Sequence, residues 1–167
     1  MEKTFGMIKP HAVRQKQHFK ILDMIEEKAG NIIFLKYTVL SSNFVEKFYF
    51  HHMDKAFFSS MIREMTSGPV IAFVVAGDNV VQKYRDLCGA TNPLEASEGT
   101  IRKKFGVNLD YNAVHASDGV QNAITEIKMF NDFVMCCEDL FECVEIFCNQ
   151  KSSSGCASSK CQKPCGK

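Results

Sequence analysis

Residues 70–76 have the sequence VIAFVVA, an unbroken apolar run. Short runs of this kind, bounded by turn signals, are typical of buried β-strands. Residues 66–69 (TSGP) end any helix before the run, and residues 77–79 (GDN) turn the chain after it. The run therefore predicts a buried strand, and the remaining elements are placed outward from it.

Helices are expected on both sides of this strand. One covers about residues 55–65, and the other is marked by Val80, Val81, Tyr84 and Leu87 at helical spacing. Periodicity and turn signals then predict the N-terminal elements: a strand at 4–9 stopped by Pro10, a helix at 19–29, a strand at 32–40, and a short helix capped by residues 41–43.

On the C-terminal side, residues 88–111 predict a long loop with only short helical pieces. A short strand at 113–115 follows, and then a helix from Asp118 to about Phe130, in which Asp118 and Gln121 resemble a capping box. Without the extra helices and the loop, the order of elements is βαββαβ. We therefore predict an α+β fold, a ferredoxin-like antiparallel sheet with helices packed on one face, added helices, and a long loop between the third and fourth strand regions.

Length and composition indicate one domain and a tail, because 167 residues with 46% apolar content suffice for a sizeable core. We expect the domain over residues 1–134 and a Cys-rich C-terminal extension, at least partly disordered, over residues 135–167. Lys and Arg number 20 against 19 Asp and Glu, so the charge balance gives no general attraction to nucleic acid or membranes. No apolar run approaches membrane-spanning length, and we expect a cytoplasmic protein without a membrane or specific nucleic-acid partner.

The cysteines are distributed unevenly along the chain. Cys88 stands alone in the body, while the other seven lie between Cys136 and Cys165, so they do not form the framework of the main fold. In the tail, Cys156, Cys161 and Cys165 permit either a zinc site or a flexible, reduced segment. The absence of C-x-x-C spacing there, and of any histidine after His115, favours the second interpretation.

His115 lies in NAVHASD, residues 112–118, between a short apolar run and a helix start. A neutral imidazole is available near pH 7 as a nucleophile, and its second nitrogen can be held by a hydrogen-bonding partner. Lys9 at a strand end, Arg85 on a helix and Arg102 after the loop would suit a polyphosphate, because guanidinium groups match phosphate oxygens and lysine adds a point charge. A structural histidine is the alternative interpretation of this stretch. The adjacent His51 and His52 also invite a metal site, but neighbouring helical residues point in different directions, so surface or supporting roles are expected.

Four motifs in order carry a resemblance to nucleoside diphosphate kinases over residues 3–130: SGPV (67–70), GATNP (89–93), GTIR (99–102) and NAVHASD (112–118). The resemblance implies a ferredoxin-like enzyme that moves the γ-phosphate of a nucleoside triphosphate onto His115 and then onto a diphosphate, in ping-pong fashion and with broad base specificity. It implies ATP and other nucleoside tri- and diphosphates as partners, a Mg²⁺ ion carried by the nucleotide phosphates, and a homo-oligomer, either a tetramer or a hexamer.

The same resemblance assigns roles to individual residues. Glu126 matches the carboxylate that orients the histidine, and Ser117 would support that carboxylate. Phe57 would stack on the base between apolar walls. The remaining matches are the phosphate-facing Lys9, Tyr49, Arg85, Thr91 and Arg102, the apolar walls Met61 and Leu109, and the ribose contacts Asn112 and Lys9.

Two departures from the family pattern bear on the site. Ala116 follows the histidine where the family usually has glycine, and alanine would be strained if the backbone needs a positive φ there. His11 stands where an Asp usually follows the strand-end Lys-Pro. The alternative function is therefore a catalytically weak nucleotide-binding or regulatory protein that keeps the pocket without turnover.

Overall fold

The computed structural model describes residues 1–136, so the Cys-rich extension lies almost wholly outside the described residues. The described part contains four strands, and one 3₁₀-helix besides its α-helices. The elements are β1 (Glu2–Ile8), α1 (Pro10–Arg14), α2 (His18–Lys28), β2 (Asn31–Val39), α3 (Ser42–Phe48), η1 (Phe50–His52), α4 (Phe58–Met65), β3 (Pro69–Gly77), α5 (Val80–Cys88), α6 (Ile101–Phe105), β4 (Val114–Ala116) and α7 (Val120–Cys136).

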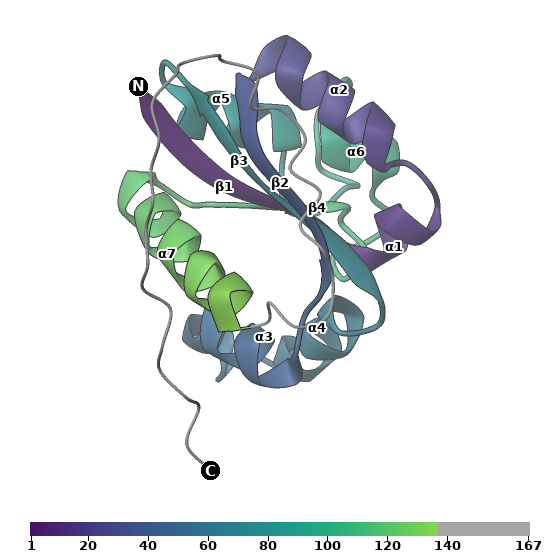
Figure 1. Cartoon of the computed structure of the whole chain (residues 1–167). Helices are drawn as coiled ribbons and strands as arrows, with labels where there is room; N and C mark the ends of the chain where they lie inside the picture. The colour runs from purple at the N-terminus through teal and green to yellow at the C-terminus, as the bar shows by residue number, and fades with distance from the viewer. Residues whose placement is uncertain (137–167) are drawn as a thin grey trace, which may run out of the picture.

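The strands form one antiparallel sheet in the order β2-β3-β1-β4 (Figure 1). The run 70–76 lies in β3, which pairs with both β1 and β2, and each of its residues is buried. The predicted α+β, ferredoxin-like fold is confirmed, because this strand order is the one that two interleaved βαβ units produce.

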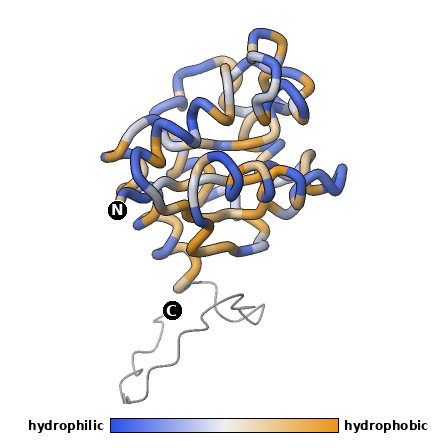
Figure 2. The backbone as a smooth tube through the Cα atoms, turned by 90° about the horizontal axis from the view of Figure 1, so that it is seen from above, coloured by the Kyte–Doolittle hydropathy of each residue, from blue (hydrophilic) through white to orange (hydrophobic). Residues whose placement is uncertain are grey.

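The expectation that helices cover one face of the sheet is wrong. Helices α1, α2 and α5 pack on one face around Phe73 and Tyr84, and α3, α4 and α7 pack on the other around Phe5 and Phe48 (Figure 1). The physical reason is visible in β3, whose apolar residues are continuous rather than alternating, so both of its faces must be buried. Figure 2 shows apolar segments through the middle of the molecule and hydrophilic turns toward its outside.

Local signals explain several element boundaries. Ser41 caps α3 as predicted, with its Oγ accepting from the N–H of Phe44 at 3.2 Å. The short α1 was not predicted; it begins at Pro10, which suits the first helical position because it lacks an N–H. Helix α7 runs beyond the predicted end at Phe130, since Val134 also packs into the core.

The predicted capping box at the start of α7 is wrong. Asp118 makes no hydrogen bond to Gln121; its Oδ1 instead accepts from Arg85 Nη1 at 2.6 Å. The long loop before β4 is confirmed, with α6 as its one described helix, capped by Thr100 Oγ1. Among residues 1–136, the structure has no helix with the length and apolar character needed to cross a membrane.

Candidate active site

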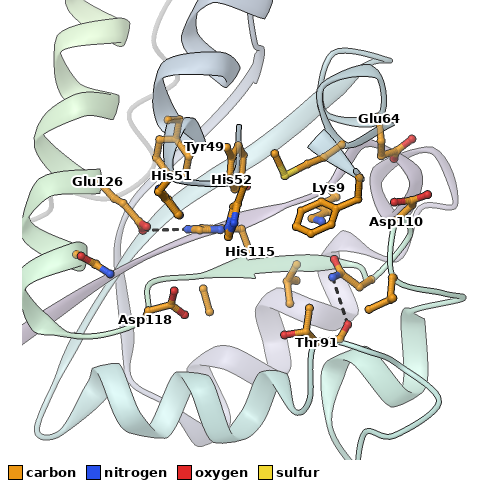
Figure 3. A pocket seen from close by; sticks show the side chains of 18 of the residues that line it. Lys9, Tyr49, His51, His52, Glu64, Thr91, Asp110, His115, Asp118 and Glu126 are labelled. Atoms are coloured by element: carbon orange, nitrogen blue, oxygen red, sulfur yellow. Dashed lines mark hydrogen bonds and ion pairs between the residues drawn. The ribbon is translucent and has the colours of Figure 1, made fainter. Parts of the chain in front are cut away.

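A cleft of about 890 Å³ opens where β4, the end of β1, α3, α4, α7 and the long loop meet (Figure 3). Every residue of the predicted site lines this cleft except Arg85 and Ser117. The residues that the fold brings together are Lys9, Tyr49, Phe57, Met61, Thr91, Arg102, Leu109, Asn112, His115 and Glu126.

His115 projects from β4 and is held by Glu126 of α7, with 2.9 Å between Nε2 and Oε2 (Figure 3). The Ser117 hydroxyl donates to the same carboxylate oxygen at 2.6 Å and accepts from the N–H of Phe5 at 3.3 Å. Because a carboxylate accepts hydrogen bonds, it selects the tautomer with the proton on Nε2. The lone pair of Nδ1 is then available, and no hydrogen bond within the described residues involves that nitrogen.

The backbone before His115 is strained at Ala113, whose φ is +69°. The N–H of Val114 donates to the carbonyl of Asn112 at 2.8 Å, closing a γ-turn with positive φ, a rare and strained conformation. The N–H of Lys9 donates to the Ala113 carbonyl at 2.9 Å and the Tyr84 hydroxyl to the His115 carbonyl at 2.9 Å, so the turn is fixed from both sides.

The expected strain at Ala116 is absent. Ala116 is an ordinary strand residue of β4 that pairs with Gly6, and its φ is not positive. The alanine therefore replaces glycine without the backbone conflict that was expected, and the strain lies three residues earlier.

Aromatic rings surround the imidazole. Phe48 and Tyr49 lie edge-on to His115, with ring centroids 5.2 and 5.6 Å away, and Phe5 lies 6.2 Å away. The Tyr49 hydroxyl is buried without a hydrogen-bond partner among the described residues. Burial raises the pKa of Tyr49 above its ordinary value, so the hydroxyl stays protonated and able to donate.

Two cations border the cleft. Burial, followed by the neighbouring Arg102 guanidinium, lowers the pKa of Lys9 to about 8. Arg102 donates from Nη1 to the Gly89 carbonyl at 2.8 Å and from Nη2 to the Val114 carbonyl at 3.2 Å, which ties the start of the loop to β4. Gly89 has a φ of +79°, and a Cβ there would lie 2.6 Å from Thr100 Oγ1, so the loop requires glycine at this position.

Arg85 and Ser117 lie beside the cleft. Arg85 Nη1 donates to Asp118 Oδ1 at 2.6 Å and to the Ser117 carbonyl at 3.2 Å. Asp118 itself lines the cleft, so Arg85 is anchored at its margin. Ser117 is fully buried behind Glu126, in the supporting position that the resemblance implied.

The outer part of the cleft is apolar and exposed. Phe57 precedes α4 and is 47% exposed, and Leu109 is 59% exposed. Met61, one helical turn after Phe57, forms the adjoining wall. Exposed flat and aliphatic faces of this kind suit a ligand that stacks.

The sequence did not identify several lining residues. His51 and His52 both line the cleft, where His51 is exposed and His52 is half-buried, a placement that the surface or supporting roles expected for them allow (Figure 3). Burial, and then the neighbouring His51, lower the pKa of His52. Glu64 and Asp110 also line the cleft. Glu64 had a recognisable signal, since it is an acid between the apolar positions of a predicted amphipathic helix.

The fold and the site define a phosphate-handling enzyme, because an oriented imidazole, two cations and an unpaired hydroxyl converge in one cleft. Comparison with known proteins supplies the family. The family model described as nucleoside diphosphate kinase matches residues 2–133. Nucleoside diphosphate kinase from Campylobacter curvus is 45% identical over 130 residues, covering 78% of this chain and 95% of that protein. The one from Lawsonia intracellularis is 43% identical, covering 78% and 94%.

Solved structures of nucleoside diphosphate kinases also resemble this chain. Apo nucleoside diphosphate kinase from Encephalitozoon cuniculi aligns with a TM-score of 0.76 at 41% identity, covering 78% of this chain and 88% of that one. The enzyme from Halobacterium salinarum, in complex with CDP, aligns with a TM-score of 0.75 at 34% identity, covering 77% and 86%. The chain belongs to the nucleoside diphosphate kinase family. It is a kinase that transfers phosphate between nucleoside tri- and diphosphates.

Proposed function

We propose that the transfer follows a ping-pong route through a phosphohistidine at His115. The observation that carries this proposal is the contact of Nε2 with Glu126, which leaves Nδ1 as the nucleophile. Nδ1 attacks the γ-phosphorus of the donor, the bond to the bridging oxygen breaks, and the diphosphate leaves with that electron pair. A terminal β-phosphate oxygen of the acceptor then attacks the same phosphorus, and the phosphorus–nitrogen bond breaks.

In this proposal Glu126 stabilises the positive charge that develops on the imidazole, and Ser117 keeps the carboxylate in position. Lys9, Arg102 and the Tyr49 hydroxyl would face the phosphate oxygens, because all three line the cleft around His115. Thr91 would add a hydroxyl contact. Arg85 would reach the phosphates from its position beside Asp118.

Mg²⁺ would be carried by the nucleotide. In the described part of the chain no three His, Cys, Asp or Glu side chains are grouped as metal ligands. Phosphate oxygens and water would therefore hold the ion. Asp118 is a carboxylate that also lines the cleft. The ion would neutralise part of the phosphate charge, while the chain's own residues orient the reacting groups.

Broad base specificity follows from the outer walls of the cleft. Phe57 would stack on the base against Met61 and Leu109, and stacking is tolerant of base identity. Asn112 and Lys9 would contact the ribose hydroxyls. A cytoplasmic location, a tetramer or hexamer, and a division into a kinase domain (1–134) and a C-terminal extension (135–167) belong to the same proposal.

The proposal is tested by incubating the protein with ATP labelled in the γ-phosphate. We expect an acid-labile, base-stable phosphoenzyme that passes its label to GDP, CDP and UDP. His115→Ala should lose both steps while still binding nucleotide, whereas His18→Ala, on α2 away from the cleft, should retain them. Nucleotide binding without labelling of the folded protein would instead support the catalytically weak alternative.

A further inference from the structure

Tyr84 is a fully buried residue of α5 to which the transfer mechanism assigns no role. It lies on the apolar stripe of this helix, and its ring packs edge-on against Phe73 of β3, with the ring centroids 5.7 Å apart. Its hydroxyl donates to the backbone carbonyl of His115 at 2.9 Å. A core tyrosine is therefore bonded directly to the backbone of the residue proposed as the nucleophile.

The Tyr84 hydroxyl is a permanent donor. Burial raises the pKa of Tyr84 well above its ordinary value, so the hydroxyl stays protonated at every pH at which the enzyme is folded and active. Cys88 lies one turn further along α5, and burial raises its pKa to about 11, so its thiol is neutral and a weak acceptor. The carbonyl of His115 is thus the stronger partner. Because a buried hydroxyl without a partner is costly, this hydrogen bond is retained.

Gly6 of β1 provides the space that the hydroxyl occupies. A Cβ at this position would lie 2.8 Å from Tyr84 Oη and would also clash with the ring of Phe73. Gly6 pairs with Ala116 in the sheet, next to His115. The missing side chain in β1 therefore lets α5 approach β4, and the contact depends on residues of α5, β1 and β4 together.

The strand that carries the nucleophile needs such support. β4 has only three residues, Val114–Ala116, lies at the edge of the sheet, and pairs there with β1. Short segments with few neighbours open locally at low free energy. Tyr84 holds this segment at the carbonyl of His115, and the next residue, Arg85, donates to the carbonyl of Ser117 at 3.2 Å. Helix α5 therefore holds the segment at two carbonyls.

The His115 side chain is held from the other face of the sheet. Helix α7 supplies Glu126, which contacts Nε2, and this helix packs on the face away from α5 (Figure 1). A reacting group keeps its geometry only when the side chain and the backbone that carries it are both supported. Glu126 orients the ring, and the Tyr84 hydroxyl limits the movement of the backbone.

We propose that Tyr84 is a positioning residue for the nucleophile: from the face of the sheet opposite Glu126, its hydroxyl fixes the backbone of His115, so that Nδ1 keeps its place in the cleft. The inference rests on the proposed function, because it takes His115 as the nucleophile. Tyr84 touches no reacting atom and acts through the carbonyl of His115. Since small displacements of a reacting atom are costly in rate, its contribution belongs to the transfer step and not to nucleotide affinity.

The test is Tyr84→Phe, which removes the hydroxyl and retains the buried ring. Single-turnover labelling with γ-labelled ATP measures the transfer step, and equilibrium binding of ADP measures affinity. We expect labelling to be about tenfold slower at unchanged affinity, because Glu126 still orients the ring. Tyr37→Phe removes an exposed hydroxyl from β2, where Tyr37 is 57% exposed, and this matched control should change neither quantity.

NMR without nucleotide tests the contact itself. The parent protein should show a Tyr84 hydroxyl proton that is protected from solvent exchange. Tyr84→Phe should shift the carbon resonance of the His115 carbonyl and speed the amide exchange of residues 114–117. A hydroxyl proton that exchanges freely in the parent protein would overturn the proposal, and this measurement does not require the variant to fold.

The kinetic outcomes separate a positioning role from a purely structural one. A lower Tm for Tyr84→Phe with an unchanged labelling rate would overturn the proposal, and so would equal losses of rate and affinity. A parent protein that ATP does not label would refute the proposed function instead. If the parent is labelled and Tyr84→Phe is labelled equally fast, the role of Tyr84 alone is refuted.

Discussion

The inner end of the cleft, around His115, and its outer end, around Phe57, are built in opposite ways. At the inner end the side chains of His115 and Glu126 are each 13% exposed and belong to a chain of hydrogen bonds that ends at the Phe5 backbone. At the outer end Phe57 is 47% exposed and lines the cleft together with the apolar Met61 and Leu109. Directional contacts fix a geometry, whereas stacking tolerates several ligands. Under the proposed function, the chemistry is specified at one end and nucleotide choice is left open at the other.

Glu126→Ala is expected to have the largest effect on catalysis at the inner end of the cleft. It removes the acceptor for both Nε2 and the Ser117 hydroxyl, so the imidazole loses its tautomer and its orientation. We expect kcat to fall about 10³-fold, within the range for loss of an orienting carboxylate, with little change in nucleotide affinity. Single-turnover labelling and equilibrium binding measure the two effects. Equal losses of affinity and rate would contradict the assignment.

Lys9→Met tests the boundary between the two ends, where a cation is buried. The pKa of Lys9 falls from 10.5 to about 8 on folding. The unfolded chain therefore binds more protons between these pH values, and the stability of the parent protein rises with pH across that window. Below about pH 8 the buried charge costs up to about 3 kcal/mol, which Lys9→Met removes.

The expected result is a free energy of unfolding that is higher for Lys9→Met at pH 7, with a difference that shrinks toward pH 10. Denaturant unfolding at a series of pH values measures it. Lys20→Met, at an exposed position on α2, provides the control and should show no such trend. A difference independent of pH would mean that the charge of Lys9 is not the cause.

Phe57→Ala sharpens the comparison from the outer end. Loss of a stacking face is worth about 1–3 kcal/mol per base, so we expect KM to rise about tenfold for purine and pyrimidine nucleotides alike, with kcat little changed. Phe57→Tyr retains the ring and should retain KM. Steady-state kinetics with ADP, GDP, CDP and UDP as acceptors measure the effect. A large fall in kcat with unchanged KM would place Phe57 in the chemistry instead.

Sequence patterns predicted the four strands, the longer helices between them and the long loop because these depend on local periodicity and turn residues. They did not predict the second covered face of the sheet, although the unbroken apolar run at 70–76 contained that information. The site was predicted through motifs, and the fold brings most of those residues together.

The missed features depend on contacts between distant elements. Glu64 and His11 are 53 positions apart in the chain, and their contact follows from the packing of α4 on α1. Arg85 meets Asp118 for a comparable reason, through the packing of α5 beside β4. By analogy with a glycine, strain was expected at Ala116 if its φ were positive, whereas the hydrogen bonds of the sheet and of Lys9 place the strain at Ala113.

Ala113→Gly has the smallest expected effect and tests what the strained turn contributes to the inner end. Glycine adopts a φ of +69° without a Cβ penalty, and this relief should raise stability by up to about 1 kcal/mol, less the entropy that glycine loses on folding. The turn would also become less rigid, so the His115 imidazole would sample more orientations, and we expect a fall in kcat of a few-fold at unchanged KM. Thermal unfolding and steady-state kinetics on the same preparation measure both changes. If stability rises while kcat stays constant, the hydrogen bonds of Glu126 and Tyr84 alone fix the imidazole, and the strain at Ala113 is a consequence of chain geometry without a catalytic role.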